Sequence, residues 1–196
     1  MNFTFAEVDG ALAAAHGIAS AKRNAFRARL QHFQKLGFPE GLNTGRGRAA
    51  VYNPGHIILL GIALELGQLG LTPERAKAVI SDDMHATAMA VAMAARGDFA
   101  VLLRCDPTAL KSLTIQEGVG DFASASFFYA GLGQAVLEFE SMFSAGMRRM
   151  AYFSVSALIE DLTGYLATPH VTAPMICEAL EAWASPFIHD DKPAGQ

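Results

Sequence analysis

Apolar residues recur at helical spacing near the start of the chain. Thr4 precedes the segment FAEVDGALAAAHG, and Glu7 stands three positions after Thr4. This is the spacing of a capping box. In SAKRNAFRARLQHFQKLG, Phe26, Leu30 and Phe33 stand at i, i+4 and i+7 and would form one apolar stripe along a helix. The pattern predicts two helices joined by the short turn HGI, the arrangement of a helix-turn-helix.

A segment rich in turn residues follows the second helix. The sequence NTGRG at residues 43–47 favours a tight turn, and AAVY at residues 49–52 is suited to a short strand that pairs back. Together they predict a small β-hairpin, or wing. Asn53 then caps a helix with Pro54 at its first position, and Thr72 repeats this start signal for the next helix.

The second half of the chain mixes helical and extended patterns. An alanine-rich helix, MHATAMAVAMAARG, precedes the strand candidate DFAVLLRC. Two more strand candidates, SASFFYAG and RRMAYFSV, alternate with amphipathic helices, and APMICEALEAWASPF predicts a last helix. We therefore expect a mostly α protein. A winged helix-turn-helix domain at residues 1–80 would be followed by an α+β domain at residues 81–196.

Composition is that of a soluble globular protein. Of 196 residues 52% are hydrophobic, which suffices for a sizeable core. No run reaches the ~20 apolar residues that span a bilayer, and the N-terminus has an acidic residue where a signal peptide needs basic ones. Cys105 and Cys177 belong to no Cys/His cluster, so reduced thiols are expected. These features predict a cytoplasmic protein with no membrane partner.

Charge is divided unevenly along the chain. Residues 1–80 hold nine Lys and Arg against five Asp and Glu, whereas residues 81–196 hold six against fourteen. The basic excess is concentrated in residues 20–52, where seven Lys and Arg face the single acid Glu40. Such a basic region in an acidic protein is the expected electrostatic footprint of nucleic-acid binding, although a solvated helix face gives the same pattern.

Three blocks within residues 4–80 stand in a recognisable order. They are FAEVDGALAAAHGI, LGFPEGLNTGRGRAAVY and YNPGHIILLGIALELGQLGLTPERAKAVI. This order of helix and turn, basic wing, tyrosine and two further helices resembles the winged helix-turn-helix domain of the MerR family of transcription regulators. The resemblance implies that Arg46, Arg48 and Tyr52 contact the DNA backbone. The chain departs from the family in its longer second helix and in the lack of a sustained heptad series after residue 80.

The second helix and the wing therefore supply the predicted DNA contacts. Arg and Gln side chains make bidentate contacts to guanine and adenine edges, and Lys and Arg bind phosphates. We expect double-stranded DNA as the main partner, a homodimer, and RNA polymerase or another protein as a further partner. The predicted DNA-binding residues are Lys22, Arg23, Asn24, Arg27, Gln31, Lys35, Arg46, Arg48 and Tyr52.

Other chemistry has weaker support in the sequence. TGRGR lacks the GxxxxGK(S/T) spacing of a phosphate loop, and the acidic and histidine residues at 82–85 and 189–191 fall at element ends, where carboxylates are usually solvated. No histidine has the partner spacing of a catalytic base. We expect no metal, no cofactor and no enzymatic activity. The alternative function is a protein-interaction adaptor that keeps the winged fold and uses FRARLQHF to hold an acidic partner.

Overall fold

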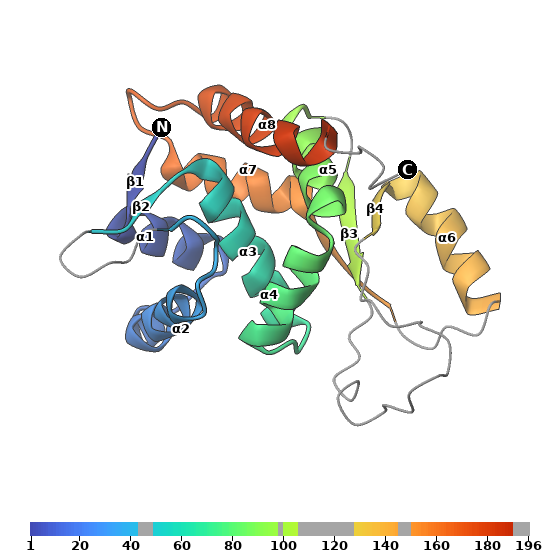
Figure 1. Ribbon diagram of the computed structural model, residues 1–196, viewed down its shortest axis with the longest axis horizontal. Coiled ribbons are helices and arrows are strands. Elements are labelled where there is room, and N and C mark those ends of the chain that lie inside the picture. The colour runs from blue at the N-terminus through green and yellow to red at the C-terminus, as the bar shows by residue number, and fades with distance from the viewer. Residues whose placement is uncertain (43–48, 98–99, 106–127, 145–149, 190–196) are drawn as a thin grey trace, which may run out of the picture.

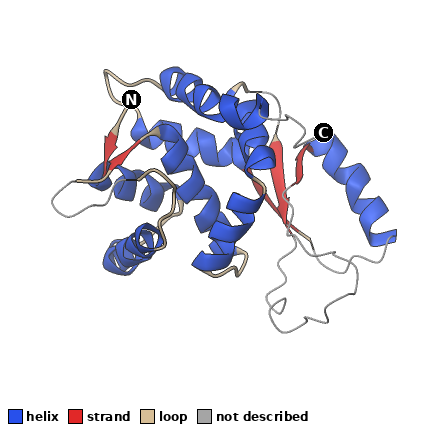
Figure 2. Cartoon of the chain, viewed as in Figure 1, coloured by secondary structure: helices blue, strands red, loops and turns tan. Residues whose placement is uncertain are grey.

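The protein is mostly helical, with two small sheets (Figures 1 and 2). The computed structural model describes residues 1–42, 49–97, 100–105, 128–144 and 150–189. Its first half contains β1 (Phe3–Thr4), α1 (Phe5–Ala15), a 3₁₀ turn (Ser20–Lys22), α2 (Arg23–Lys35), β2 (Val51–Tyr52), α3 (Pro54–Gln68) and α4 (Pro73–Asp82). The predicted helices of this half are confirmed.

The second half adds four helices and a second sheet in its described part. The elements are α5 (Met84–Ala95), β3 (Val101–Cys105), β4 (Phe128–Gly131), α6 (Leu132–Ser144), β5 (Ala151–Ser154), α7 (Val155–Leu166) and α8 (Ala173–His189). The three strands form an antiparallel sheet in the order β4-β3-β5. All the helices and strands expected here are present, and α6 lies at the outer edge of the molecule beside β4 (Figure 1).

Capping residues set where the helices of the first half begin. The Thr4 hydroxyl accepts the backbone N–H of Glu7, and the Glu7 carboxylate accepts the backbone N–H of Thr4 at 2.7 Å. This second bond is the largest reason why the pKa of Glu7 is lowered. Asn53 forms the same reciprocal cap with His56 at the start of α3. Thr72 caps α4, so all three predicted helix starts are confirmed.

The first strand pairs with the strand that follows the turn-rich segment. Phe3 lies opposite Tyr52 and Thr4 opposite Val51, in antiparallel register. The hairpin expected from the sequence would give residues 49–52 a neighbouring partner, whereas their described partner comes from the chain start. Phe3 and Tyr52 are both buried, which explains why this distant pairing is favourable. The turn itself, at residues 43–48, lies outside the described residues.

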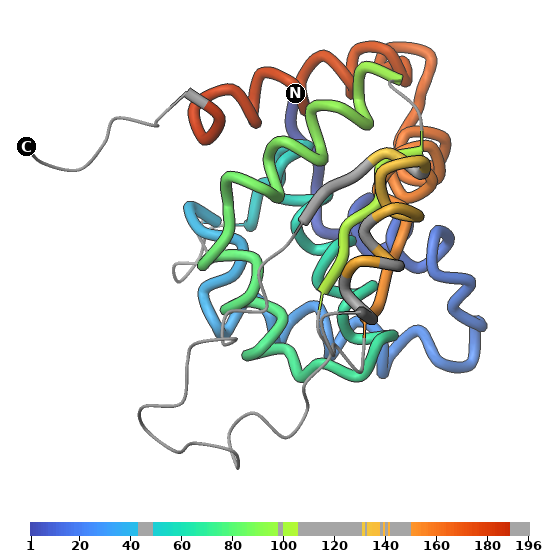
Figure 3. The backbone as a smooth tube through the Cα atoms, turned by 90° about the vertical axis from the view of Figure 1, so that its right-hand side faces the viewer, coloured from blue at the N-terminus to red at the C-terminus, as the bar shows by residue number. Residues whose placement is uncertain are grey.

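The core is built around α3. Eleven of its 15 residues are buried, and α4, α7 and α8 all pack against it. The same helix α8 also packs along α5 (Figure 3). α1 packs most extensively on α7, so one cluster of buried apolar side chains extends from Phe3 to Leu180. This core crosses the boundary at residue 80 that the sequence suggests between two domains.

Two close contacts join α3 to the C-terminal helices. A Cβ added to Gly55 would lie 2.2 Å from the ring of Trp183 in α8, and one added to Gly61 would lie 3.2 Å from Leu158 in α7. At Gly55 any larger residue would force the Trp183 ring to move, and at Gly61 the fit to Leu158 is tight. α3 therefore needs α7 and α8 to complete its burial.

Replacing Gly55 by Ala should destabilise the fold, because the Trp183 ring must move to make room for the new methyl group. We expect the free energy of unfolding to fall by about 1–3 kcal/mol in urea titrations. Gly67→Ala is the matched control in the same helix, because nothing lies within 4 Å of its added Cβ. That control should gain about 0.5–1 kcal/mol from helix propensity. Equal stability of the two variants would refute the proposed Gly55–Trp183 constraint.

The isolated segment 1–80 should fail to fold cooperatively, because it lacks the α7 and α8 surfaces that cover α1 and α3. Circular dichroism during heating should show a broad, shallow change for the segment and a sharp transition for the full chain. A sharp transition of the segment alone would instead support two independent domains.

Candidate nucleic-acid interface

The apolar stripe of α2 faces the protein interior. Phe26, Leu30 and Phe33 are buried, and the Phe33 ring packs against that of Phe38 with centroids 5.8 Å apart. The opposite face of the helix is therefore directed to solvent. Asn24 and Gln31 lie on that face at i and i+7 and are exposed. The predicted division of α2 into an apolar and a polar face is confirmed.

Polar contacts from α4 fix one flank of α2. The Lys77 ammonium donates to the Leu36 carbonyl at 2.6 Å, where α2 ends and its carbonyl groups lack helical partners. His32 Nε2 lies 2.9 Å from Glu74 Oε1. The pKa of Glu74 is lowered, first by its own backbone N–H and then by His32. α4 thus holds both the end and the side of α2.

Tyr52 fixes α2 from the direction of β2. Its side chain is fully buried, and its hydroxyl accepts a hydrogen bond from the Gln34 side chain. Burial raises the pKa of Tyr52, and the bond from Gln34 opposes this shift only in part. The predicted contact of Tyr52 with the DNA backbone does not fit this position, because no side-chain surface is available to a phosphate. The residue instead anchors β2 to α2.

Two predicted DNA contacts, Arg23 and Arg27, share a buried carboxylate in α1. Their Nη2 atoms lie 2.9 and 3.0 Å from the same oxygen, Oδ2 of Asp9. The Asp9 side chain is 2% exposed, whereas those of Arg23 and Arg27 are 31% and 48% exposed. The other oxygen, Oδ1, is buried and has no hydrogen-bond partner within the described part of the chain. This cluster of Asp9, Arg23 and Arg27 is called the carboxylate–arginine cluster below.

The remaining predicted contacts divide into exposed and undescribed residues. Arg46 and Arg48 lie outside the described residues. One exposed basic residue of α2, Arg29, stands beside this set and was not among the predicted contacts. The sequence holds no acid between Asp9 and Glu40, so α2 brings no negative charge of its own to this face. The predicted contacts with exposed side chains are Lys22, Asn24, Arg27, Gln31 and Lys35.

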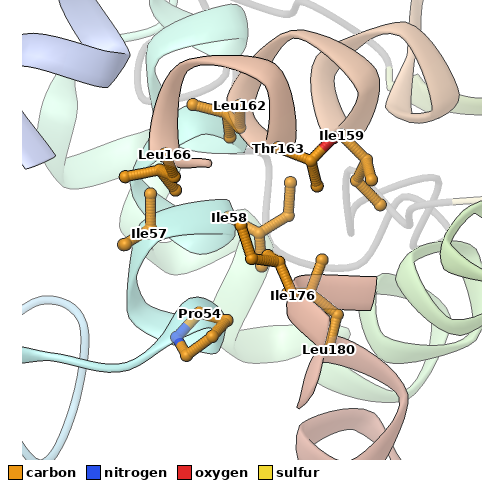
Figure 4. Close-up of a pocket in the computed structure, with 9 residues that line it drawn as sticks. All are labelled: Pro54, Ile57, Ile58, Ile159, Leu162, Thr163, Leu166, Ile176 and Leu180. Atoms are coloured by element: carbon orange, nitrogen blue, oxygen red, sulfur yellow. The ribbon is translucent and has the colours of Figure 1, made fainter. Parts of the chain in front are cut away.

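The cavities described near this region are small or shallow. Figure 4 shows a gap between α3, α7 and α8 with mostly apolar walls; its volume is about 10 Å³, near the minimum that holds one water molecule. A groove of about 130 Å³ follows α2, with Arg29 and Phe33 on one side and Leu64 and Leu71 on the other. The groove is open to a partner's side chain, whereas the gap is a feature of core packing.

The described residues lack two other kinds of feature, a metal site and a membrane-spanning helix. They contain no group of three or more His, Cys, Asp or Glu side chains placed to hold a metal ion. Among them, no helix combines the length and apolar character needed to cross a membrane.

Comparisons of the chain with protein-family models, curated proteins and solved structures found no match. The functional assignment therefore depends on the geometry and chemistry of α2 and its surroundings.

His56 couples the start of α3 to pH. Its Nδ1 accepts the backbone N–H of Asn53, which requires that this nitrogen carry no proton, and its ring lies edge-on to Tyr52. Burial lowers the pKa of His56, and a smaller contribution from the backbone of Glu40 opposes the shift. In the unfolded chain the pKa of histidine is about 6.5. The unfolded state therefore binds the proton more readily than the folded state.

We expect the free energy of unfolding to be greatest above about pH 6.5 and to decline as the pH falls through the lowered pKa of His56. His56→Gln should remove part of this decline, because glutamine also completes a capping box but does not titrate. Urea titrations of both proteins between pH 7.5 and pH 5 provide the measurement. Parallel pH profiles would show that another group is responsible.

Proposed function

We propose that the protein is a DNA-binding regulator of transcription that places α2 in the major groove of duplex DNA. The observation that carries the proposal is the solvent face of α2, where basic and amide side chains are exposed without an acid among them. Amide side chains suit base edges and basic side chains suit phosphates. Asn24 and Gln31 are assigned to base edges, and Lys22 and Lys35 to the backbone.

The dimensions and rigidity of α2 support this use. Its 13 residues span about 20 Å, and a B-DNA major groove is about 12 Å wide, which admits one helix. The apolar stripe, the α4 contacts and the Gln34–Tyr52 bond hold the helix on the sides that face the protein. Because α2 is fixed in this way, it would lose little conformational freedom on binding DNA.

The winged helix-turn-helix arrangement is part of the proposal. α1 and α2 supply the two helices, and β2, which pairs with β1, comes after segment 43–48 in the chain. Arg46 and Arg48 in that segment are assigned to phosphates, as the MerR resemblance implies. Because one short helix reads only a few base pairs, we further propose that the protein acts as a homodimer on two half-sites.

The groove beside α2 favours a second candidate function. Arg29, which is exposed beside this groove, suits an acidic side chain of a partner peptide. On this alternative the protein is an adaptor, and its affinity for DNA would be absent. RNA polymerase or another protein could use the same groove in a DNA-bound regulator.

The double variant Lys22→Ala, Lys35→Ala should weaken DNA binding by removing two phosphate contacts. Fluorescence anisotropy of a labelled duplex, with the full chain at several salt concentrations, gives the slope of log affinity against log salt. The slope should decrease in magnitude by about 2, since each lost contact contributes about 0.9. The fold should persist, because both side chains are exposed.

Arg96→Ala is the matched control. Arg96 is basic and exposed but lies after α5, paired with Glu181 of α8 at 2.9 Å, so its loss should leave the slope unchanged. Sequences enriched by the wild-type protein from random duplex DNA would test base reading. An unaltered slope in the double variant would exclude these lysines as backbone contacts. Absence of any binding to duplex DNA would favour the adaptor function.

A further inference from the structure

We propose that Asp9 is a positioning residue whose buried carboxylate holds the side chains of Arg23 and Arg27 in place. Both guanidinium groups then bind one DNA phosphate beside the start of α2. The inference rests on the proposed DNA-binding function. It adds a second kind of contact to that function: a phosphate site assembled from α1 and α2, distinct from the exposed lysines. The sequence predicts Arg23 and Arg27 as DNA contacts, whereas the role of Asp9 comes from the structure.

The geometry leaves most of the arginine donors available. A guanidinium has five N–H donors, and the observed contact joins one nitrogen of each arginine to Asp9 Oδ2. Asp9 lies beneath the pair, while substantial fractions of both arginine side chains remain exposed. The donors that do not face Asp9 can therefore reach a phosphate oxygen from the solvent side. Guanidinium forks fit phosphate geometry in this bidentate manner.

The electrostatics of the carboxylate–arginine cluster favour an anion as its ligand. Arg23 and Arg27 are spaced i, i+4 on α2, and like charges at this spacing repel each other. One carboxylate offsets this repulsion but leaves the three groups with a net charge of about +1. A phosphodiester carries one negative charge and would complete the neutralisation. A duplex backbone presents such a charge at the surface where α2 is proposed to bind.

Fold stability alone gives a poor account of Asp9. Its carboxylate lies in the buried face of α1 with Val8, Ala11 and Leu12, and one of its oxygens has no partner among the described residues. Burying an ionised carboxylate carries a large desolvation cost, and replacing a buried ion pair by apolar side chains of similar volume is often neutral or stabilising. An apolar side chain in this position would suit the core better. Fold stability does not account for the carboxylate, whereas the ordering of two flexible arginine side chains before a ligand binds does.

The test compares two variants that remove one negative charge each. Asp9→Asn keeps the shape of the side chain but weakens its hold on Arg23 and Arg27. Glu40→Gln removes an exposed charge from the same part of the chain without touching the cluster. Charge counting predicts that both variants bind a random-sequence duplex as tightly as the wild type or more tightly. Positioning predicts that only Asp9→Asn binds more weakly, by about tenfold at fixed salt, because two side chains must then be ordered on binding.

A second variant addresses the risk that Asp9→Asn disturbs the fold. Arg23→Lys, Arg27→Lys alters only partly exposed side chains and keeps their charge, but it removes the guanidinium forks. Its affinity for the duplex should fall several-fold while the salt slope stays unchanged. Thermal unfolding of every variant checks the fold separately from binding.

The outcomes separate this inference from the proposed function. If the wild type binds duplex DNA and Asp9→Asn binds as tightly as Glu40→Gln, the positioning role is wrong and DNA binding stands. If the double lysine variant has the same affinity for the duplex as the wild type, the guanidinium groups of Arg23 and Arg27 do not bind a phosphate. If the wild type binds no duplex at all, both the positioning role and the DNA-binding function are wrong. Weaker binding by Asp9→Asn and by the double lysine variant, with Glu40→Gln unaffected, supports the inference.

Discussion

Burial of α3 is the constraint on which the rest of the structure depends. A helix with eleven buried residues among 15 has no broad polar face, so it needs neighbours on nearly every side. α4, α7 and α8 provide them, and Gly55 lets the Trp183 ring lie against the helix backbone. The start of α3 also fixes the position of Tyr52, because Asn53 both follows the last residue of β2 and caps α3. The strand pair and α2 are thus positioned from the same point.

The exposed face of α2 is a consequence of how firmly its other sides are held. The apolar stripe faces the core, Gln34 satisfies the buried Tyr52 hydroxyl, and Lys77 satisfies the last carbonyl group of the helix. A buried hydroxyl without such a partner would be costly. Each of these contacts orders α2 without using its solvent face. The exposed side chains of that face, among them Asn24 and Gln31, take no part in these contacts.

The sequence predicted what depends on near neighbours. Thr4, Asn53 and Thr72 act on residues three positions away, so their caps could be identified from spacing alone. The stripe of α2 and the strands of the second sheet follow from periodicity in the same way. Contacts between distant residues left no such signal. Tyr52 was interpreted as a DNA contact, although its hydroxyl accepts a hydrogen bond from Gln34 within the protein.

Asp9 shows why part of the candidate site could not be predicted. An aspartate on an otherwise apolar face of the first helix is expected to be buried. The sequence does not show which of the following basic residues would pair with it. The pairing of Asp9 depends on how α1 crosses α2, and the packing of the core sets this crossing. The one signal available was the acid itself among Val8, Ala11 and Leu12. A buried acid followed by a long basic segment is a reason to expect an internal ion pair.

The continuous core also bears on how the two halves of the chain could influence each other. α1 carries Asp9 toward α2 and packs most extensively on α7 on its other side. The helix that carries the carboxylate under Arg23 and Arg27 is therefore in direct contact with α7. Such contiguous packing is the physical condition for coupling between sites, although coupling further requires two alternative arrangements of α7. Two domains joined only by a linker would lack that route, because nothing in one would contact the element that orders the other.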